Sequence, residues 1–101
     1  MNVLEDSEFI ICTDMGGRQS FISERCDYLP PHALLAVSEV LASGADKYGV
    51  ENWHNVSPYE HLGRCIRHAL RFFASGDVVE LKNSACRCLM ALELFLLTKE
   101  Q

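Results

Sequence analysis

The chain has 101 residues, a formal net charge of −5 and 49% hydrophobic residues. This length corresponds to a single domain, and the acidic balance argues against general binding of nucleic acid through a basic surface. The apolar run 89–97 is too short to span a membrane and contains Glu93, so we expect no membrane association.

The chain contains five cysteines, Cys12, Cys26, Cys65, Cys86 and Cys88. Their number is odd and they include no C-x-x-C pair, so reduced core thiols explain them better than disulfides or a thiolate metal site. Residues 1–8 are acidic and lack the basic and apolar regions of a signal peptide. These features predict a cytoplasmic protein.

Residues 1–28 are predicted to form an irregular N-terminal arm. Residues 8–12 (EFIIC) are compatible with a short strand or with an arm that packs on a partner, and the pair Gly16-Gly17 interrupts any regular element. Arg18 follows the two glycines, where the backbone can approach a phosphate group closely. Arg18 is therefore a candidate phosphate contact, with an ordinary turn as the alternative.

A first helix is predicted over 31–43. Pro30 and Pro31 mark its start, because proline is favoured in the first helical turn and disfavours helix in the preceding residue. Gly44 ends or bends this helix. Glu39 projects beside the buried side, where it is either a metal ligand or a residue at the edge. The positions predicted to be buried are Ala33, Leu34, Val37, Val40 and Leu41.

Residues 45–56 are predicted to form a loop, with or without one more helical turn through Lys47 and Tyr48. The loop combines a cation, large aromatic rings and an amide. Tyr48 or Trp53 could stack on a nucleobase, while Asn52 could bind the edge of that base. Equally well, the two aromatic side chains fill the core where the loop crosses the bundle.

A second helix is predicted over 58–75. Ser57 suits the N-cap position, Pro58 the first helical position and Glu60 the third. Gly76 fits the C-cap, because glycine readily adopts the left-handed conformation that ends many helices.

A third helix is predicted over 78–99, with Asp77 as its cap and Glu80 in the capping-box position. Residues 29–101 would then form one helical domain. The fold class is all-α, a small bundle of about three main helices that homo-oligomerisation completes, because so short a chain buries little of its apolar surface alone. The apolar positions that fit the helical period of the third helix are Leu81, Ala85, Cys88, Leu89, Leu92, Phe95 and Leu96.

Polar side chains of the second helix share one narrow stripe, within about a third of the helix circumference at about 100° per residue. Arginines so close together repel one another unless an anion or an acidic partner meets them. A solvated surface is the alternative, but the stripe favours a site for phosphate groups. Its members are Glu60, His61, Arg64, Arg67, His68 and Arg71.

Glu80 and Asn83 lie three residues apart near the start of the third helix, so their oxygen atoms share one helical face. Such oxygens are ligands for Mg²⁺, and helix bundles hold metal ions between facing helices. Glu60 could supply further oxygen, because a short turn brings the third helix back against the second. The alternative for Glu80 is a capping role alone.

The order of these motifs over about residues 14–97 resembles the phage-type dATP/dGTP diphosphohydrolases. This family is a branch of the all-α nucleoside triphosphate pyrophosphohydrolases, the MazG-like superfamily. The combination of G-A-x-K-Y, N-W and R-H is fairly specific, although no single piece is. The motifs that carry the resemblance are GGRQS at 16–20, LPPHAL at 29–34, GADKYG at 44–49, NW at 52–53, RH at 67–68 and GD at 76–77.

The resemblance implies Mg²⁺-dependent cleavage of a purine (deoxy)nucleoside triphosphate, with Mn²⁺ as an alternative ion. The products would be the monophosphate and pyrophosphate. In the superfamily, carboxylates in E-E-x-x-E and E-x-x-D patterns hold the metal ions on antiparallel helices. By position, Glu60-His61-x-x-Arg64 corresponds to the first pattern and Glu80-x-x-Asn83 to the second. His61, Arg64 and Asn83 therefore stand where relatives carry carboxylates.

The residue patterns and the resemblance together give a candidate site. The expected metal ligands are Glu39, Glu60, Glu80 and Asn83. The expected catalytic residues are Glu60, Glu80 and His61, with His61 as a proton relay. The expected substrate-binding residues are Arg18, Lys47, Asn52, Trp53, Arg64, Arg67 and His68, where His68 fixes the substrate or a carboxylate.

The expected partners are the nucleotide and further copies of the chain, as a homodimer or a homotetramer. The expected location is the cytoplasm, which is the host cytoplasm if the protein is phage-encoded. An alternative is a non-catalytic protein that binds or sequesters nucleotides, keeping the fold without the full set of metal ligands. A third interpretation is an interaction module whose helices pair with a partner.

Overall fold

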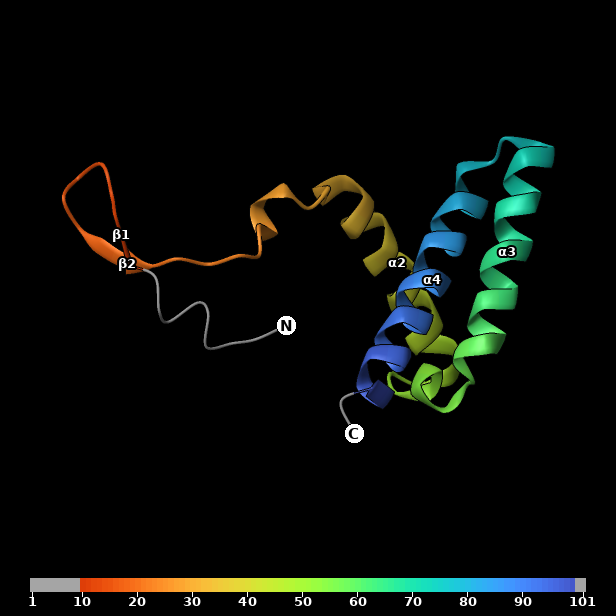
Figure 1. Ribbon diagram of the computed structural model, residues 1–101. Helices are drawn as coiled ribbons and strands as arrows, with labels where there is room; N and C mark the ends of the chain where they lie inside the picture. The colour runs from red at the N-terminus through yellow and green to blue at the C-terminus, as the bar shows by residue number, and fades with distance from the viewer. Residues whose placement is uncertain (1–9, 100–101) are drawn as a thin grey trace.

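The computed structural model describes residues 10–99. Its long elements are the helices α2 (Pro31–Tyr48), α3 (Pro58–Ser75) and α4 (Val78–Lys99). Figure 1 shows α3 and α4 side by side as an antiparallel hairpin, and α2 packs against α4. The predicted all-α class is confirmed. Across the described residues, no helix combines the length and the apolar character that a membrane span requires.

The helix α3 has the two caps that the sequence predicts. The Ser57 Oγ accepts a hydrogen bond from the N–H of Tyr59 at 3.2 Å, and Pro58 occupies the first helical turn. At the other end, Gly76 has a φ of 73° and donates its N–H to the carbonyl of Phe72 at 2.7 Å. Both predictions about the ends of this helix are confirmed.

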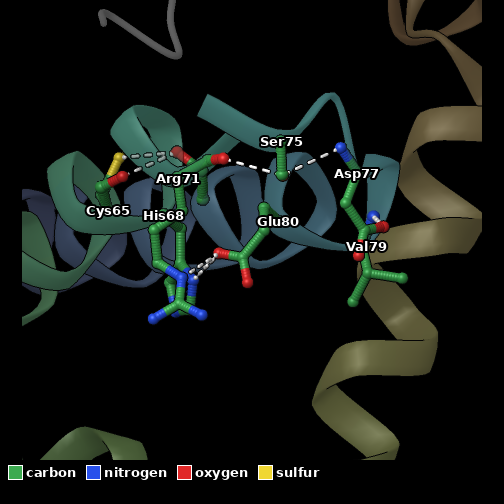
Figure 2. A network of polar contacts seen from close by, with 8 residues as sticks. Cys65, His68, Arg71, Ser75, Asp77, Val79 and Glu80 are labelled. Atoms are coloured by element: carbon green, nitrogen blue, oxygen red, sulfur yellow. Dashed lines mark hydrogen bonds and ion pairs between the residues drawn. The ribbon is translucent and has the colours of Figure 1, made fainter. Parts of the chain in front are cut away.

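The start of α4 differs from the predicted capping box. Asp77 caps the helix, since its Oδ1 accepts the N–H of Val79 at 3.0 Å. The side chain of Glu80 does not turn back to cap the N–H of Asp77, because the Ser75 Oγ already accepts that N–H at 3.1 Å (Figure 2). The capping-box interpretation is therefore wrong, and Glu80 is free to contact His68 on α3.

The helix α2 extends further than its sequence suggests. It continues through Gly44 to Tyr48, so Gly44 does not end the helix, and the alternative of a further helical turn through Lys47 and Tyr48 is confirmed. A glycine inside a helix costs only about 0.5–1 kcal/mol, which the rest of the helix outweighs. The helix ends instead at Gly49, which has a φ of 95° and donates its N–H to Ala45 at 2.9 Å. The short helix η2 (Asn52–Asn55) then leads to α3.

The N-terminal arm contains a small hairpin of β1 (Ile10–Cys12) and β2 (Arg18–Ser20). The strands are antiparallel, with Ile11 opposite Gln19. A short helix η1 (Cys26–Tyr28) precedes α2, and Figure 1 shows the hairpin standing apart from the helices. The possible strand at 8–12 is thus confirmed for residues 10–12, and the rest of that segment lies outside the described residues.

The thiols of all five cysteines are free. Desolvation raises the pKa values of the Cys86 and Cys88 thiols, which favours their protonated form. Only Cys86 is buried among the cysteines, whereas Cys12, Cys26 and Cys88 are exposed. The prediction of core positions is therefore wrong for these three.

The two sides of the α3–α4 hairpin differ strongly in burial. His61 of α3 is fully buried, at 0% exposure, although it belongs to the predicted cationic stripe. On the opposite side of the helix, Ile66, Leu70 and Phe73 are 60%, 64% and 83% exposed. Part of the apolar side of α3 thus faces outward in the single chain.

Candidate functional site

A cavity of about 480 Å³ lies between α2, η2 and the inner side of the α3–α4 hairpin. Its volume falls within the roughly 300–1,000 Å³ typical of sites for small molecules. Apolar side chains such as Val40, Leu41 and Met90 contribute to its wall. The polar and aromatic residues that line it include Asn52, Trp53, His61, His68, Asn83 and Arg87.

Beside the cavity, Glu80 joins two cationic or protonatable side chains of α3. Its Oε2 lies 3.0 Å from His68 Nδ1 and 3.3 Å from Arg71 Nε. Figure 2 shows the nitrogen atoms of both side chains converging on this carboxylate. Because an ionised carboxylate only accepts hydrogen bonds, His68 donates its Nδ1–H to Glu80. His68 also lines the cavity, so it connects the cavity with the charged cluster.

The electrostatic surroundings keep Glu80 ionised. The hydrogen bond from His68 lowers the pKa of the Glu80 carboxyl most, and the charges of Arg71, His68 and Arg67 lower it further. Partial desolvation opposes this shift without reversing it. The carboxylate form is the one that could bind a cation or orient a water molecule.

Arg67 adds positive charge to this end of the hairpin. It is exposed, and none of the ion pairs among residues 10–99 involves it. Arg64, one turn away, lies 3.3 Å from Glu60 through its Nε. Arg67 is therefore more available than Arg64 for a phosphate group.

At the inner end of the cavity, His61 connects three elements. Its Nδ1 lies 3.0 Å from Nη1 of Arg87, and its Nε2 lies 2.9 Å from the carbonyl oxygen of Trp53. Because a guanidinium only donates, Nδ1 accepts from Arg87 and Nε2–H donates to Trp53. Both ring nitrogens of His61 are thus engaged in the fold.

A further hydrogen bond joins α3 and α4 between the His68–Glu80 and the His61–Arg87 contacts. The buried Ser84 Oγ donates to the carbonyl of Cys65 at 2.9 Å. This bond locks the register that places His68 opposite Glu80 and His61 opposite Arg87.

The structure brings only part of the predicted site together. Asn52, Trp53, His61, His68 and Asn83 all line one cavity, and Glu80 contacts His68 directly. Their assignment to substrate or metal stays a prediction.

Other predicted site residues lie elsewhere. Glu39 is 3.3 Å from Lys82 Nζ, and Glu60 is two helical turns from His68, about 12 Å along α3. Lys47 is exposed and does not line the cavity. Arg18 lies in the N-terminal hairpin, away from the helices (Figure 1).

The donor atoms in the described part of the chain do not form a ready-made metal cage. No group of three or more His, Cys, Asp or Glu side chains within residues 10–99 is arranged to hold one ion. Glu80 and Asn83 are the two neighbouring oxygen donors on α4. They suit an ion that is bound mainly by substrate phosphates, as Mg²⁺ usually is.

Arg87 is a cavity residue that the sequence patterns do not reveal. It lies four residues after Asn83 and seven after Glu80, so all three share one face of α4. This spacing was visible in the sequence, but Arg87 stands between two cysteines in an apolar helix, and nothing there shows which side of the helix faces a cavity.

The fold and the site define a small helical protein in which a pocket for a small molecule adjoins a charged cluster. The chain belongs to the dATP/dGTP diphosphohydrolase N-terminal domain family, whose model matches residues 14–101. This match confirms the resemblance noted in the sequence. No curated protein and no solved structure gives a significant match to the chain.

Proposed function

We propose that this protein hydrolyses a purine (deoxy)nucleoside triphosphate to the monophosphate and pyrophosphate. The observation that carries the proposal is the position of His68, which lines the cavity and contacts Glu80 beside Arg71. A nucleotide with its base in the cavity would therefore direct its phosphates toward this charged cluster. Membership in a family described as dATP/dGTP diphosphohydrolases supports the same substrate class.

The cations at this end of the hairpin would bind the triphosphate. Arg71 lies beside Glu80, and Arg67, whose charge also acts on Glu80, forms no ion pair among the described residues. Positive charges that are in place before the reaction stabilise the charge that develops on the leaving pyrophosphate. Such electrostatic stabilisation is usually the largest single catalytic contribution.

Glu80 and Asn83 would be the protein ligands of a Mg²⁺ ion that is bound with the nucleotide. When bound, Mg²⁺ would neutralise phosphate charge and make the phosphorus atom more electrophilic. His68 would hold the Glu80 carboxylate in one orientation through its Nδ1–H. The roles of Glu39 and Glu60 as further ligands stay predictions, since both contact other side chains.

The test is the release of pyrophosphate from dGTP, dATP, GTP and ATP, with and without Mg²⁺. We expect turnover that requires Mg²⁺, and a loss of roughly 100-fold or more in kcat/KM for Glu80→Gln, as for other groups that stabilise a transition state. Glu93→Gln is the matched control, because Glu93 is an exposed carboxylate on the same helix. An unchanged rate for Glu80→Gln would remove the cluster from the mechanism.

The alternative function is binding of nucleotides without hydrolysis. It is favoured by His61, Arg64 and Asn83, which stand where the resemblance to the superfamily implies carboxylates. Calorimetry with dGTP and Mg²⁺ separates the two functions: tight binding without release of pyrophosphate would support the binding protein. We place either activity in the cytoplasm, where free thiols remain reduced.

We also propose that the protein works as a homo-oligomer. The outward side of α3 exposes Ile66, Leu70 and Phe73, which recur at helical spacing and form an apolar stripe. Contiguous apolar surface of this kind marks an interaction site in a folded protein. A second copy is the expected partner, because a two-fold axis through the stripe would pair the same side chains from both chains.

A further inference from the structure

Arg87 is a cation that the proposed reaction does not use. It is half-buried, lines the cavity and donates from Nη1 to His61. No carboxylate among residues 10–99 forms an ion pair with it. A guanidinium with lost solvation and no acidic partner is unfavourable on its own, so its position calls for a ligand with hydrogen-bond acceptors.

His61 fixes the position of this guanidinium. Its Nε2–H bond to the Trp53 carbonyl sets the tautomer, and Nδ1 then accepts from Arg87. This bond occupies one of the five N–H donors that a guanidinium carries. The remaining donors are held in a fixed plane beside the cavity, in the fork geometry that suits a pair of acceptor atoms.

The wall around Arg87 favours a flat ring over a phosphate group. Val40, Leu41 and Met90 are apolar, and Trp53 adds an aromatic surface. A phosphate group placed there would lose its hydration in return for one cation, which is costly. A nucleobase instead offers apolar faces to this wall and acceptor atoms along its edge.

The direction of α4 also places the base of a bound nucleotide near Arg87. Arg87 lies seven residues from Glu80, about 10 Å along the helix. A nucleotide that placed its phosphates at Glu80, Arg67 and Arg71 would bring its base to the Arg87 end. Arg67 and Arg71 would thus face the phosphates of the nucleotide, and Arg87 would face its base.

We propose that Arg87 recognises the O6 and N7 edge of a guanine base in the cavity and makes the site selective for guanine over adenine. Guanine presents two adjacent acceptors on this edge, whereas adenine presents N7 beside an amino donor, which opposes a guanidinium. This inference rests on the proposed nucleotide site and assigns it a preferred base. From the energy of such bidentate pairs, we expect a preference of roughly 10- to 100-fold.

The test is binding of α,β-imido analogues of dGTP, dITP and dATP, followed through the fluorescence of Trp53, the single tryptophan, and by calorimetry. We expect the dGTP and dITP analogues to bind alike, because hypoxanthine keeps O6 and N7, and the dATP analogue to bind at least 10-fold more weakly. Arg87→Met should remove this preference. Lys82→Met, which removes a cation of the same helix that pairs with Glu39, should keep it.

Arg87→Lys keeps the positive charge but lacks the forked donors of the guanidinium, so it should also lose the preference for guanine. This variant serves as the test if Arg87→Met fails to fold. An unchanged ratio of dGTP to dATP affinity in either variant would overturn the inference. An equal loss of affinity for both nucleotides and for inorganic pyrophosphate would also overturn it, because Arg87 would then bind phosphate. Release of pyrophosphate by the wild type is measured separately. The proposed hydrolysis can therefore prove wrong while the preference for guanine holds, and the preference can prove wrong while hydrolysis holds.

Discussion

The inner and outer sides of the α3–α4 hairpin reverse the usual arrangement of a small helical protein. On the inner side, His61 is fully buried and His68 contacts Glu80 beside the cavity. On the outer side, Leu70 and Phe73 are 64% and 83% exposed. Polar groups are buried only when they are paired, whereas exposed apolar stripes indicate a partner. The difference supports both proposals, a ligand site on the inner side and a contact with a second copy on the outer side.

Leu70→Glu should break the outer side of this comparison and have the largest effect. A carboxylate buried in an apolar interface is strongly unfavourable, so we expect association to weaken at least 100-fold. The measurement is sedimentation equilibrium of the wild type and the variant. In the single chain Leu70 is exposed, so the fold should change by less than about 0.5 kcal/mol.

Ser43→Glu is the control for this prediction, because Ser43 is an exposed residue of α2 outside the cavity lining. It should leave association unchanged. A wild type that sediments as a monomer at all concentrations would contradict the proposed oligomer.

His61→Leu should break the inner side. The substitution leaves the Trp53 carbonyl and one N–H of Arg87 without their partner, and a buried group that loses its hydrogen bond costs about 1–3 kcal/mol. Urea unfolding followed by circular dichroism measures this loss. His32→Leu, at an exposed position of α2, should cost far less; equal losses would mean that the His61 contacts contribute nothing to the fold.

Gly76→Ala tests the turn that holds the two helices together. Gly76 has a φ of 73°, where a side chain is strained, so we expect a loss of about 1 kcal/mol in the free energy of unfolding. Gly63→Ala is the matched control inside α3: a Cβ there meets no atom within 4 Å, and alanine should add about 0.5–1 kcal/mol. The opposite signs of the two changes should appear in thermal unfolding.

Both ends of α3 could be predicted because local chemistry determines them. Ser57 and Gly76 act through their own conformations and through neighbours a few residues away. The end of α2 stays open in the sequence, because Gly44 can end a helix or lie inside one, and the structure places the end at Gly49. Only the surrounding structure distinguishes the two cases.

The inward direction of the polar groups was harder to predict. The stripe from Glu60 to Arg71 marked the right helix, but a helical period shows which residues share a face and not where that face points. Arg87 was missed for the same reason. Its partner His61 lies 26 positions away in the chain, and Trp53, which contacts His61, lies 34 positions away. Only the register of the helix pair therefore reveals the cavity.

Acidification should produce the smallest effect, and it should act on the inner side alone. The pKa of the Glu80 carboxyl is lowered from its ordinary value of 4.5, chiefly by the hydrogen bond from His68. A lowered pKa in the folded state means that the contact stabilises the fold above about pH 4.5 and that this stabilisation disappears as the pH falls through the lowered value. Glu80→Gln should therefore be less stable than the wild type at pH 6, and the difference should shrink toward pH 3. Urea unfolding of both proteins across this range is the measurement, with Glu93→Gln as the control; a constant difference would mean that the Glu80 charge does not stabilise the hairpin.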